Sequence, residues 1–357
     1  MKIKMTLLYL LLIFLDSSVY SAFTTNLLNT GAANTKLLIL AIEAAVAIYI
    51  YLDLTKLKLM SRLSLKKWSV LGLVAGLTAW VVPNDQIIVK LLIYMVITMS
   101  TSLITLDVSN RILEISKSIE LGFMKMANLK TAATLFGFFL GAVIALNSLK
   151  MVTVISVSFF MIILLLIPKN EVLNEHSESI KIKALSEKKS FWILGLLSAN
   201  TIIWIPLVAS NFIHHADYSK YIYVPFVLPG IITLLVFKIL KNHQINRVMI
   251  YLIFMLVALG LVAGYYLHNI PLQISMLCLM VPTSLLTSIY VRSSFLTKNS
   301  QINKKVLIQM LSVNSNIFLL IFALISLNFA HIESIIVLFN LVSVVILIRG
   351  EKNENRN

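Results

Sequence analysis

Long apolar segments recur from one end of the chain to the other, separated by short polar stretches. A helix needs about 20 residues to cross the hydrocarbon core of a bilayer, and most of these segments approach or exceed that length. They lie near residues 5–25, 37–59, 69–83, 87–106, 126–146, 150–168, 190–212, 221–239, 247–267, 271–291, 306–327 and 331–348. We therefore predict an all-α membrane protein with twelve transmembrane helices joined by short connections.

The composition supports a membrane protein and excludes a soluble globular one. Of the 357 residues, 59% are hydrophobic and only 13% are charged, whereas about 25% of the residues of soluble domains are charged. The mean hydropathy is +0.92. Twelve helices of about 20 residues each leave room for connections but not for a sizeable extramembrane domain.

The formal net charge of +15 follows the predicted topology. If the N-terminus lies inside, the 30 Lys and Arg residues fall on the inner side with four exceptions, Lys36, Lys90, Lys150 and Lys220. Basic residues gather on the cytoplasmic loops of membrane proteins. We therefore place both termini in the cytoplasm and expect no nucleic-acid partner. Richness in Ile, Lys and Asn is typical of an AT-rich genome, and the expected location is a bacterial cell membrane.

The longest polar interruption, Lys169–Ser190, lies almost at the midpoint and divides six predicted spans from six. It predicts an N-terminal half at 1–168, a cytoplasmic linker at 169–189 and a C-terminal half at 190–357. Many transporters consist of two similar halves. A shift of 184 residues places Asp16 over Asn200, each in the first span of its half, which agrees with such a repeat.

Glycine pairs with four-residue spacing occur in three predicted spans. They are Gly72 and Gly76, Gly137 and Gly141, and Gly260 and Gly264. The G-x-x-x-G spacing places both glycines on one helix face, where a neighbouring backbone can approach closely. Tight helix packing is favoured over a direct role in substrate binding.

The architecture resembles the major facilitator superfamily, which has twelve spans in a 6+6 arrangement and a basic inner loop between spans 2 and 3. The family signature in that loop is G-x-L-x-D-R-x-G-R/K-R/K, and the corresponding stretch is LKLMSRLSLKK, Leu57–Lys67. Arg62 matches the signature arginine, whereas Leu57, Ser61 and Ser64 replace glycine, aspartate and glycine. Lys66 and Lys67 supply the basic pair one position later than in the signature. The resemblance implies a conformational-gating loop formed by Asp53, Ser61, Arg62, Lys66 and Lys67.

Two further positions bear on this resemblance. The family carries an arginine toward the outer part of span 4, where this chain offers Lys90. Its antiporters carry G-x-x-x-G-P in span 5, where Ala142 follows Gly141 in place of proline. A divergent member of the superfamily and a different twelve-helix protein both fit these departures.

Among the acidic residues, Asp16 and Glu43 lie well inside predicted spans. A charged carboxylate at the centre of a membrane helix costs about 2.5–3.5 kcal/mol on insertion scales, and protonation removes that charge. A carboxyl group that binds a proton facing one side and releases it facing the other can couple transport to protons. We therefore predict Asp16 and Glu43 as proton-coupling residues. The alternative, that they only bond to nearby groups such as Ser17 and Ser18, stays open.

Neutral polar residues in the C-terminal half are candidates for lining a substrate cavity. They are Asn200, Trp204, Gln273 and Asn314. Hydrogen bonding between helices explains each of them at least as well. Embedded acids combined with a lack of deeply embedded Lys or Arg favour a cationic or neutral lipophilic substrate, unless Lys90 or Lys125 is drawn inward. With the resemblance, this pattern implies efflux of the multidrug type.

No cofactor, metal site or disulfide framework is predicted. The single cysteine, Cys278, lies within an apolar span. His214, His215 and Asp217 lie close together in an outer loop, but a metal site needs further ligands and a fixed geometry. A solvated loop is the favoured interpretation.

The first apolar segment has two interpretations. Lys2 and Lys4, the apolar run Leu7–Leu15 and the small residues of Val19–Ala22 are typical of a secretory signal peptide. Alternatively, the segment is the first span of the mature chain. We favour the second interpretation because removal of the segment would leave eleven spans, remove the counterpart of residues 190–212 and discard Asp16.

The expected function is secondary active transport, with proton-coupled export of a cationic or neutral lipophilic small molecule, and not an enzymatic activity. One alternative is a transporter-like accessory protein for peptide secretion or immunity. A lesser alternative is a membrane glycan polymerase or lipid-linked transferase. Such an enzyme needs an extramembrane surface for a polar substrate, and the longest predicted outer loop has only about a dozen residues.

Overall fold

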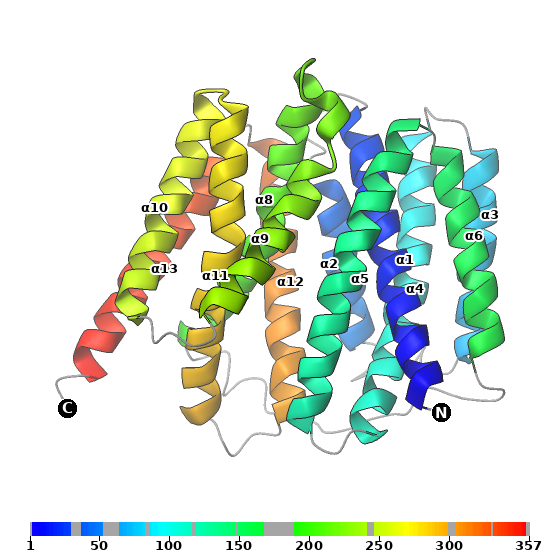
Figure 1. Ribbon diagram of the computed structural model, residues 1–357, viewed down its shortest axis with the longest axis horizontal. Coiled ribbons are helices and arrows are strands. Elements are labelled where there is room, and N and C mark those ends of the chain that lie inside the picture. The colour runs from blue at the N-terminus through cyan, green and yellow to red at the C-terminus, as the bar shows by residue number, and fades with distance from the viewer. Residues whose placement is uncertain are drawn as a thin grey trace. The chain divides into compact units, whose positions relative to one another are not determined.

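The computed structural model describes residues 2–29, 37–52, 64–82, 86–115, 119–147, 149–167, 189–240, 246–298, 304–329 and 331–354. Within these ranges the chain forms twelve α-helices and no β-strand (Figure 1), which confirms the predicted all-α class. The first six are α1 (Lys2–Asn29), α2 (Leu38–Leu52), α3 (Leu65–Val81), α4 (Ile87–Ile115), α5 (Ile119–Asn147) and α6 (Leu149–Leu166). The others are α8 (Lys189–His214), α9 (Val224–Leu240), α10 (Arg247–Tyr266), α11 (Ile270–Lys298), α12 (Lys304–Asn328) and α13 (Ile332–Glu354), with the short 3-10 helix η3 (Ser219–Tyr221) after α8.

Each predicted apolar segment coincides with one of these helices, and local chemistry accounts for several helix ends. α3 ends at Val81 and α6 at Leu166, each two residues before a proline, and a proline disfavours helical geometry in the residue before it. α10 begins after Asn246, whose side chain accepts a hydrogen bond from the backbone N–H of Val248 at 2.9 Å. Such an N-cap satisfies one of the donors left over at a helix start.

Six of the described helices are long and apolar enough to cross a membrane, and they lie within α1, α4, α8, α10, α11 and α13. Shorter apolar helical segments lie within α2, α5, α6, α9 and α12. A multi-pass membrane protein is therefore supported. The count of twelve spans and the cytoplasmic location of both termini stay predictions.

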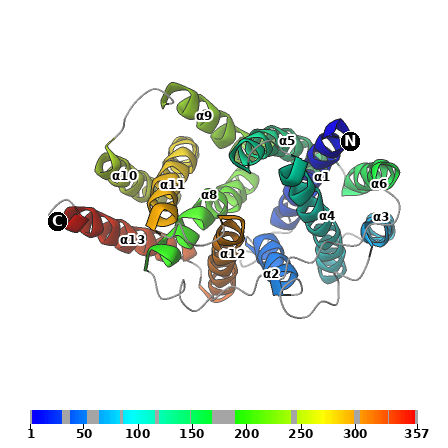
Figure 2. The same ribbon diagram turned by 90° about the horizontal axis from the view of Figure 1, so that it is seen from below.

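Packing groups the chain into two compact units. The first comprises Met1–Gly31 and Ala45–Ser179, and the second comprises Ala32–Ala44 and Ile180–Asn357. In the first unit, α1 packs against α4, α5 and α6, while α3 packs against α4 and α6 (Figure 2). The core of this unit includes Leu8, Leu12 and Leu15 of α1, which are almost fully buried.

The second unit repeats this pattern of helix pairs. In it, α8 packs against α11 and α12, α11 packs against α9 and α10, and α10 packs against α13. When the helices of each half are counted in chain order, both units pair the first with the fourth and fifth helices, and the third with the fourth and sixth. A duplicated six-helix half produces this recurrence. The division at 1–168, 169–189 and 190–357 itself stays a prediction, since 168–188 lie outside the described residues.

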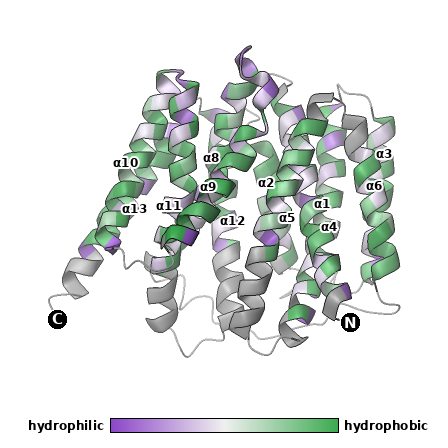
Figure 3. Cartoon of the chain, in the orientation of Figure 1, coloured by the Kyte–Doolittle hydropathy of each residue, from purple (hydrophilic) through white to green (hydrophobic). Residues whose placement is uncertain are grey.

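Outward faces of several helices are apolar (Figure 3). α3 exposes Val70, Val74 and Leu77, and α10 exposes Leu252, Leu256 and Leu259. Residues three and four positions apart lie on the same helix face, so each set forms one exposed apolar stripe. Exposed apolar faces of this kind suit contact with lipid tails rather than with water.

The three G-x-x-x-G pairs lie in helix contacts, which confirms the packing interpretation. A Cβ atom added at Gly137 of α5 would lie 2.2 Å from the Ser17 Oγ atom of α1, and one added at Gly141 would lie 2.0 Å from the Ser18 carbonyl oxygen. In the other two pairs, Gly72 and Gly76 face α6, and Gly260 and Gly264 face α11. The backbones of α1 and α5 are therefore close enough that a side chain at Gly141 would collide with main-chain atoms.

Candidate functional site

The predicted coupling residue Asp16 joins α1 to α4 inside the first unit. Its Oδ1 atom accepts a hydrogen bond of 2.7 Å from the Thr101 hydroxyl of α4. Thr101 is fully buried, whereas Asp16 is only partly buried. The same hydroxyl lies 3.1 Å from the Thr98 carbonyl oxygen, so it has two acceptors within reach. The Thr101 hydroxyl can therefore donate its hydrogen either to the Asp16 carboxyl or to the Thr98 carbonyl oxygen.

The serines beside Asp16 bond to their own helix. The Ser17 hydroxyl donates to the Ile13 carbonyl at 2.6 Å, and the Ser18 hydroxyl donates to the Phe14 carbonyl at 2.7 Å. Short polar side chains in helices commonly form such bonds to the preceding turn. The partner that the structure gives Asp16 is thus on another helix, and the sequence did not indicate it. Lys130 of α5 also exerts an attractive electrostatic interaction on the Asp16 carboxylate.

A buried cation lies further along the same pair of helices. Lys90 of α4 is only 7% exposed, and its Nζ atom donates to the Asn26 Oδ1 atom of α1 at 3.3 Å. Asn26 lies ten residues from Asp16 along α1, and Lys90 lies eleven from Thr101 along α4, so the two contacts are separated by roughly 15 Å along the helix axes. Lys90 is thus drawn inward. A cationic substrate was favoured because deeply embedded Lys or Arg residues were lacking, so the buried Lys90 makes a cationic substrate less favoured.

The second unit has two corresponding contacts made of neutral groups. Gln273 is the fourth residue of α11, as Lys90 is of α4, and its Oε1 atom accepts a hydrogen bond from Asn211 Nδ2 of α8 at 2.9 Å. Ser284 is the fifteenth residue of α11, as Thr101 is of α4, and its hydroxyl donates to the Leu197 carbonyl of α8 at 2.8 Å. The first and fourth helices of each unit are therefore joined at two matching levels.

Two predicted cavity residues, Asn200 and Trp204, take part in a buried contact between α8 and α13. The Asn200 Nδ2 atom donates to Asn340 Oδ1 at 2.6 Å, and the Asn340 Nδ2 atom donates back to Asn200 Oδ1 at 3.0 Å. The Trp204 indole N–H donates to the same Asn200 oxygen at 3.3 Å. All three side chains are buried. This geometry favours the interhelical alternative for Asn200.

Gln273 and Asn314 also bond to neighbouring helices. The Gln273 Nε2 atom donates to the Gly264 carbonyl of α10 at 3.0 Å, and the Asn314 Nδ2 atom donates to the Phe191 carbonyl of α8 at 2.6 Å. The Oδ1 atom of Asn314 is buried and has no hydrogen-bond partner among the described residues. Of the four candidates, Asn314 therefore keeps an acceptor for a further group. The cavity role of all four stays a prediction.

The remaining predicted site residues are only partly described. Glu43 lies on α2 and is partly buried. It belongs to the segment grouped with the second unit, and its coupling role stays a prediction. In the predicted gating loop, Asp53, Ser61 and Arg62 lie outside the described residues. Lys66 and Lys67 lie in the first turn of α3, where Lys66 is partly buried and Lys67 is exposed.

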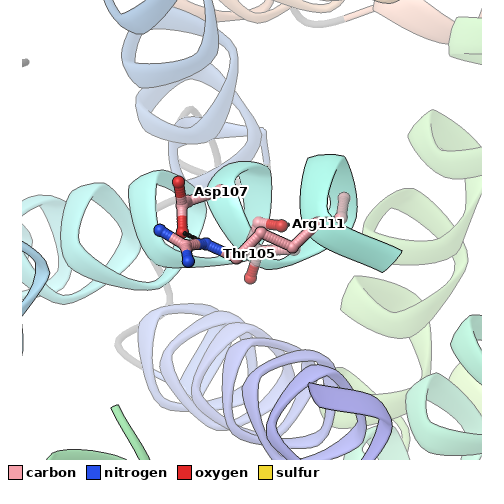
Figure 4. A network of polar contacts seen from close by, with 4 residues as sticks. Thr105, Asp107 and Arg111 are labelled. Carbon is pink, nitrogen blue, oxygen red and sulfur yellow. Dashed lines mark hydrogen bonds and ion pairs between the residues drawn. The ribbon is translucent and has the colours of Figure 1, made fainter. Parts of the chain in front are cut away.

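An ion pair lies near the end of α4 that the predicted topology places inside (Figure 4). The Arg111 Nε atom donates to the Asp107 Oδ2 atom at 2.5 Å, and the Asp107 side chain is 4% exposed. One turn lies between the two residues, which is the spacing at which oppositely charged side chains of a helix meet. The Ser109 hydroxyl bonds to the Thr105 carbonyl at 2.6 Å beside this pair.

A buried acid lies at the start of α13, and the sequence pattern did not indicate its burial. Glu333 is fully buried, although its place two residues inside the predicted segment 331–348 suggested the edge of a span.

The exposed loop cluster contains a weak contact of 4.0 Å between His215 Nδ1 and Asp217 Oδ2. In the described ranges, no three His, Cys, Asp or Glu side chains form a group that could hold a metal ion.

Solved structures of transporters share this fold over almost the whole chain. The nucleoside transporter NupG is 14% identical, with a TM-score of 0.63 and coverage of 98% of each chain. A D-xylose–proton symporter is 12% identical, with a TM-score of 0.62, covering 96% of this chain and 95% of its own. No protein-family model and no curated sequence matches.

Both structures have the major facilitator fold, so the chain has the architecture that the resemblance implied. Identities this low show the fold alone. The two similar structures are those of transporters.

Proposed function

We propose that the chain is a secondary active transporter that couples the movement of a small molecule across the membrane to protons, with Asp16 as the proton-binding residue. The observation that carries this proposal is the contact between Asp16 and Thr101, which places a carboxyl group between two helices of a major facilitator fold. A change in the charge of this carboxyl acts directly on the hydrogen bond that joins α1 to α4.

Thr101 supplies a way to link the charge of Asp16 to the α1–α4 contact. A hydroxyl has one hydrogen to donate, and Thr101 has the Asp16 carboxylate at 2.7 Å and the Thr98 carbonyl at 3.1 Å as acceptors. An ionised Asp16 attracts this hydrogen, since bonds to charged acceptors are the stronger ones. A protonated Asp16 donates instead, and the Thr101 hydroxyl turns to Thr98. Proton binding thus reverses the direction of the bond that joins the two helices.

The proposed substrate is a neutral or cationic small molecule with lipophilic parts, and the buried Lys90 shifts the balance toward a neutral one. Lys90 places positive charge in the first unit beside Asn26, so the unit is not purely acidic. The named substrates of the two similar structures, a nucleoside and D-xylose, are proposed here as the first neutral compounds to test. We keep export as the proposed direction, and assays with either gradient orientation test it.

Transport assays in proteoliposomes with an Asp16→Asn variant test the coupling role. The variant is expected to lose accumulation driven by a pH gradient, because asparagine cannot carry the proton. It is expected to keep exchange of labelled for unlabelled substrate across the membrane, because exchange needs no net proton movement. Labelled uridine, D-xylose and tetraphenylphosphonium serve as probes, with the pH gradient imposed in both directions.

The matched control is Asp217→Asn, which makes the same chemical change on a side chain that is 85% exposed in a loop. This control should transport like the unaltered chain. Gradient-driven accumulation by Asp16→Asn at the unaltered rate would rule out the coupling role. If the unaltered chain moves none of the probes under either gradient while remaining folded, the substrate proposal fails for these neutral and cationic compound classes.

A further inference from the structure

A long stretch of the second unit contains basic residues and no acidic ones. Between Asp217 and Glu333 the sequence has no Asp or Glu, but it has eight basic residues: Lys220, Lys238, Lys241, Arg247, Arg292, Lys298, Lys304 and Lys305. All of these except Lys220 lie on the side that the predicted topology places inside. The polar stretch 169–190 instead mixes both signs of charge. The segment from α9 to α12 therefore carries positive charge at its inner side that no acid within the segment balances.

The structure describes two of these cations at the inner ends of two helices that share a neighbour. Lys238 lies in the last turn of α9, and Arg247 is the first residue of α10. Both side chains are exposed. α9 and α10 each pack against α11 (Figure 2). The two cations thus lie on the same side of the second unit, on either helix that contacts α11.

The Arg247 side chain lies against an aromatic ring of α11. Its Cζ atom is 5.8 Å from the centroid of the Tyr290 ring, which is within the range of a cation–π contact. Such a contact uses the face of the guanidinium group, whereas its five N–H donors lie in the plane of the group. These donors form the planar fork that binds a phosphate through two hydrogen bonds. We call Lys238, Arg247 and Tyr290 the basic edge.

The surface next to the basic edge is apolar and exposed. Leu234 and Leu235 of α9 are exposed, and they lie four and three residues before Lys238, so the three side chains share one helix face. The exposed apolar stripe of α10 lies on the helix that begins with Arg247. A molecule bound here therefore meets positive charge at the helix ends and apolar side chains along the helices.

The neighbouring helix α13 does not neutralise the basic edge. It packs against α10, and its last turns contain two bases, Arg349 and Lys352, and two acids, Glu351 and Glu354. These four residues contribute no net charge to this side of the unit.

The combination of charge and apolar surface fits a phospholipid better than an acidic protein segment. An acidic protein segment would match the charge alone. An anionic phospholipid matches both features, because it carries a phosphate at the membrane surface and acyl chains below it. The cytoplasmic leaflet is negatively charged, and basic sites between helices on that side bind anionic headgroups.

We propose that the basic edge is a binding site for an anionic phospholipid of the inner leaflet. Lys238 and Arg247 contact its phosphate, and its acyl chains lie along the exposed apolar faces of α9 and α10. Tyr290 is a positioning residue that acts through the Arg247 guanidinium. The site belongs to the second unit and does not involve Asp16, which belongs to the first.

Native mass spectrometry of the full chain, purified in a nonionic detergent, measures the binding of added lipid. Phosphatidylglycerol is expected to bind more tightly than phosphatidylcholine with the same acyl chains. Lys238→Gln and Arg247→Gln are each expected to weaken the binding of phosphatidylglycerol about fivefold, which is the usual contribution of one basic residue near an anionic membrane surface. Tyr290→Leu should weaken it as well, whereas Tyr290→Phe should retain it because the ring face remains.

The matched control is Lys220→Gln, which removes the same charge from an exposed residue on the predicted outer side of the same unit. It should bind phosphatidylglycerol like the unaltered chain. Equal affinity for the two lipids, or an equal loss of affinity in Lys220→Gln, would overturn the proposal. Displacement of the bound lipid by a polyglutamate peptide would also overturn it and would favour an acidic protein segment.

Thermal unfolding without added lipid checks that each variant is folded. If either Lys238→Gln or Arg247→Gln does not fold, the other one decides, because each removes one of the two proposed phosphate contacts. The binding measurement requires no transport, so a failure of this proposal is distinguishable from a failure of the proposed function. Asp16→Asn should leave the affinity for phosphatidylglycerol unchanged.

Discussion

Several buried polar side chains in the described helices form hydrogen bonds with groups on neighbouring helices. Asn200 pairs with Asn340, Gln273 with Asn211, and Asn314 with a backbone carbonyl. The sequence identified three of these as polar residues inside apolar spans, but the choice between cavity lining and helix contact depends on which helix faces them. That information lies in partners 62 to 140 positions away, which a local pattern does not contain.

The Asn200–Asn340 pair provides a test at this scale. Asn200→Ala is expected to destabilise the chain, because Asn340 would keep a buried amide without its partner. Hydrogen bonds between membrane helices contribute about 0.6 kcal/mol on average and about 1.7 kcal/mol at most. A double-mutant cycle with Asn340→Ala, in which the free energy of unfolding of each variant is measured in detergent, should give a coupling free energy in that range. A coupling near zero together with a loss of substrate affinity would instead favour the cavity role.

Candidate site residues were predictable to different degrees. Asp16 could be found because a lone acid in the middle of an apolar span is costly. The burial of Glu333 was not predictable, because a carboxyl near a helix start ordinarily lies at the membrane surface and only the packing of α13 against its neighbours determines whether it is covered. Thr101 and Lys130 carry no distinguishing signal in the sequence, since their relevance comes only from the proximity of α4 and α5 to α1.

At the scale of elements, the sequence predicts the helices well and their pairing only in part. Apolar length is enough to place a membrane helix, because lipid requires the backbone to satisfy its own hydrogen bonds. The G-x-x-x-G pairs indicated three helix faces that pack tightly, but not which neighbour each one meets. Only the structure assigns the glycines of α5 to α1 and those of α3 to α6.

The α1–α5 contact makes a sharp prediction about substitution. Gly141→Ala places a methyl group 2.0 Å from a backbone oxygen of Ser18, whereas Gly76→Ala places one 3.3 Å from the Val157 side chain. The first change should lower stability by about 1–3 kcal/mol, since overpacking forces the backbone to move, and the second should be nearly neutral. Thermal unfolding in detergent, followed by size-exclusion chromatography, measures both. Equal melting temperatures for the two variants would contradict the close approach of α1 and α5.

At the scale of the whole molecule, the repeated helix pairs support two related halves, and the distribution of basic residues predicts their orientation in the membrane. The Lys and Arg pattern predicts that both termini lie inside, because charge bias in loops is a local property of the sequence. The packing of the two units by contrast depends on long-range contacts. The alignment of Asp16 with Asn200 suggested a repeat in the sequence. The recurrence of the same helix pairs in both units is visible only in the structure.

Cysteine labelling tests this topology. Cys278 is buried, and replacing it with serine gives a background without thiols, because it is the single cysteine of the chain. Asp217→Cys in this background is expected to react with a membrane-impermeant maleimide in intact cells. Lys67→Cys, at another exposed position, is expected to react only after the membrane is opened. Labelling of both positions in intact cells would contradict the assignment of inner and outer sides.

The contacts Lys90–Asn26 and Gln273–Asn211 occupy matching places in the two units, but only the first includes a charge. A transmembrane voltage acts on charges and not on neutral amides, with about 2.3 kcal/mol for an elementary charge carried across a difference of 100 mV. Movement of α4 along the membrane normal therefore carries Lys90 through part of the electric field, while the same movement of α11 carries no charge at that level. The two halves are alike in shape but electrically unequal at this contact, and the membrane potential acts there on the first half alone.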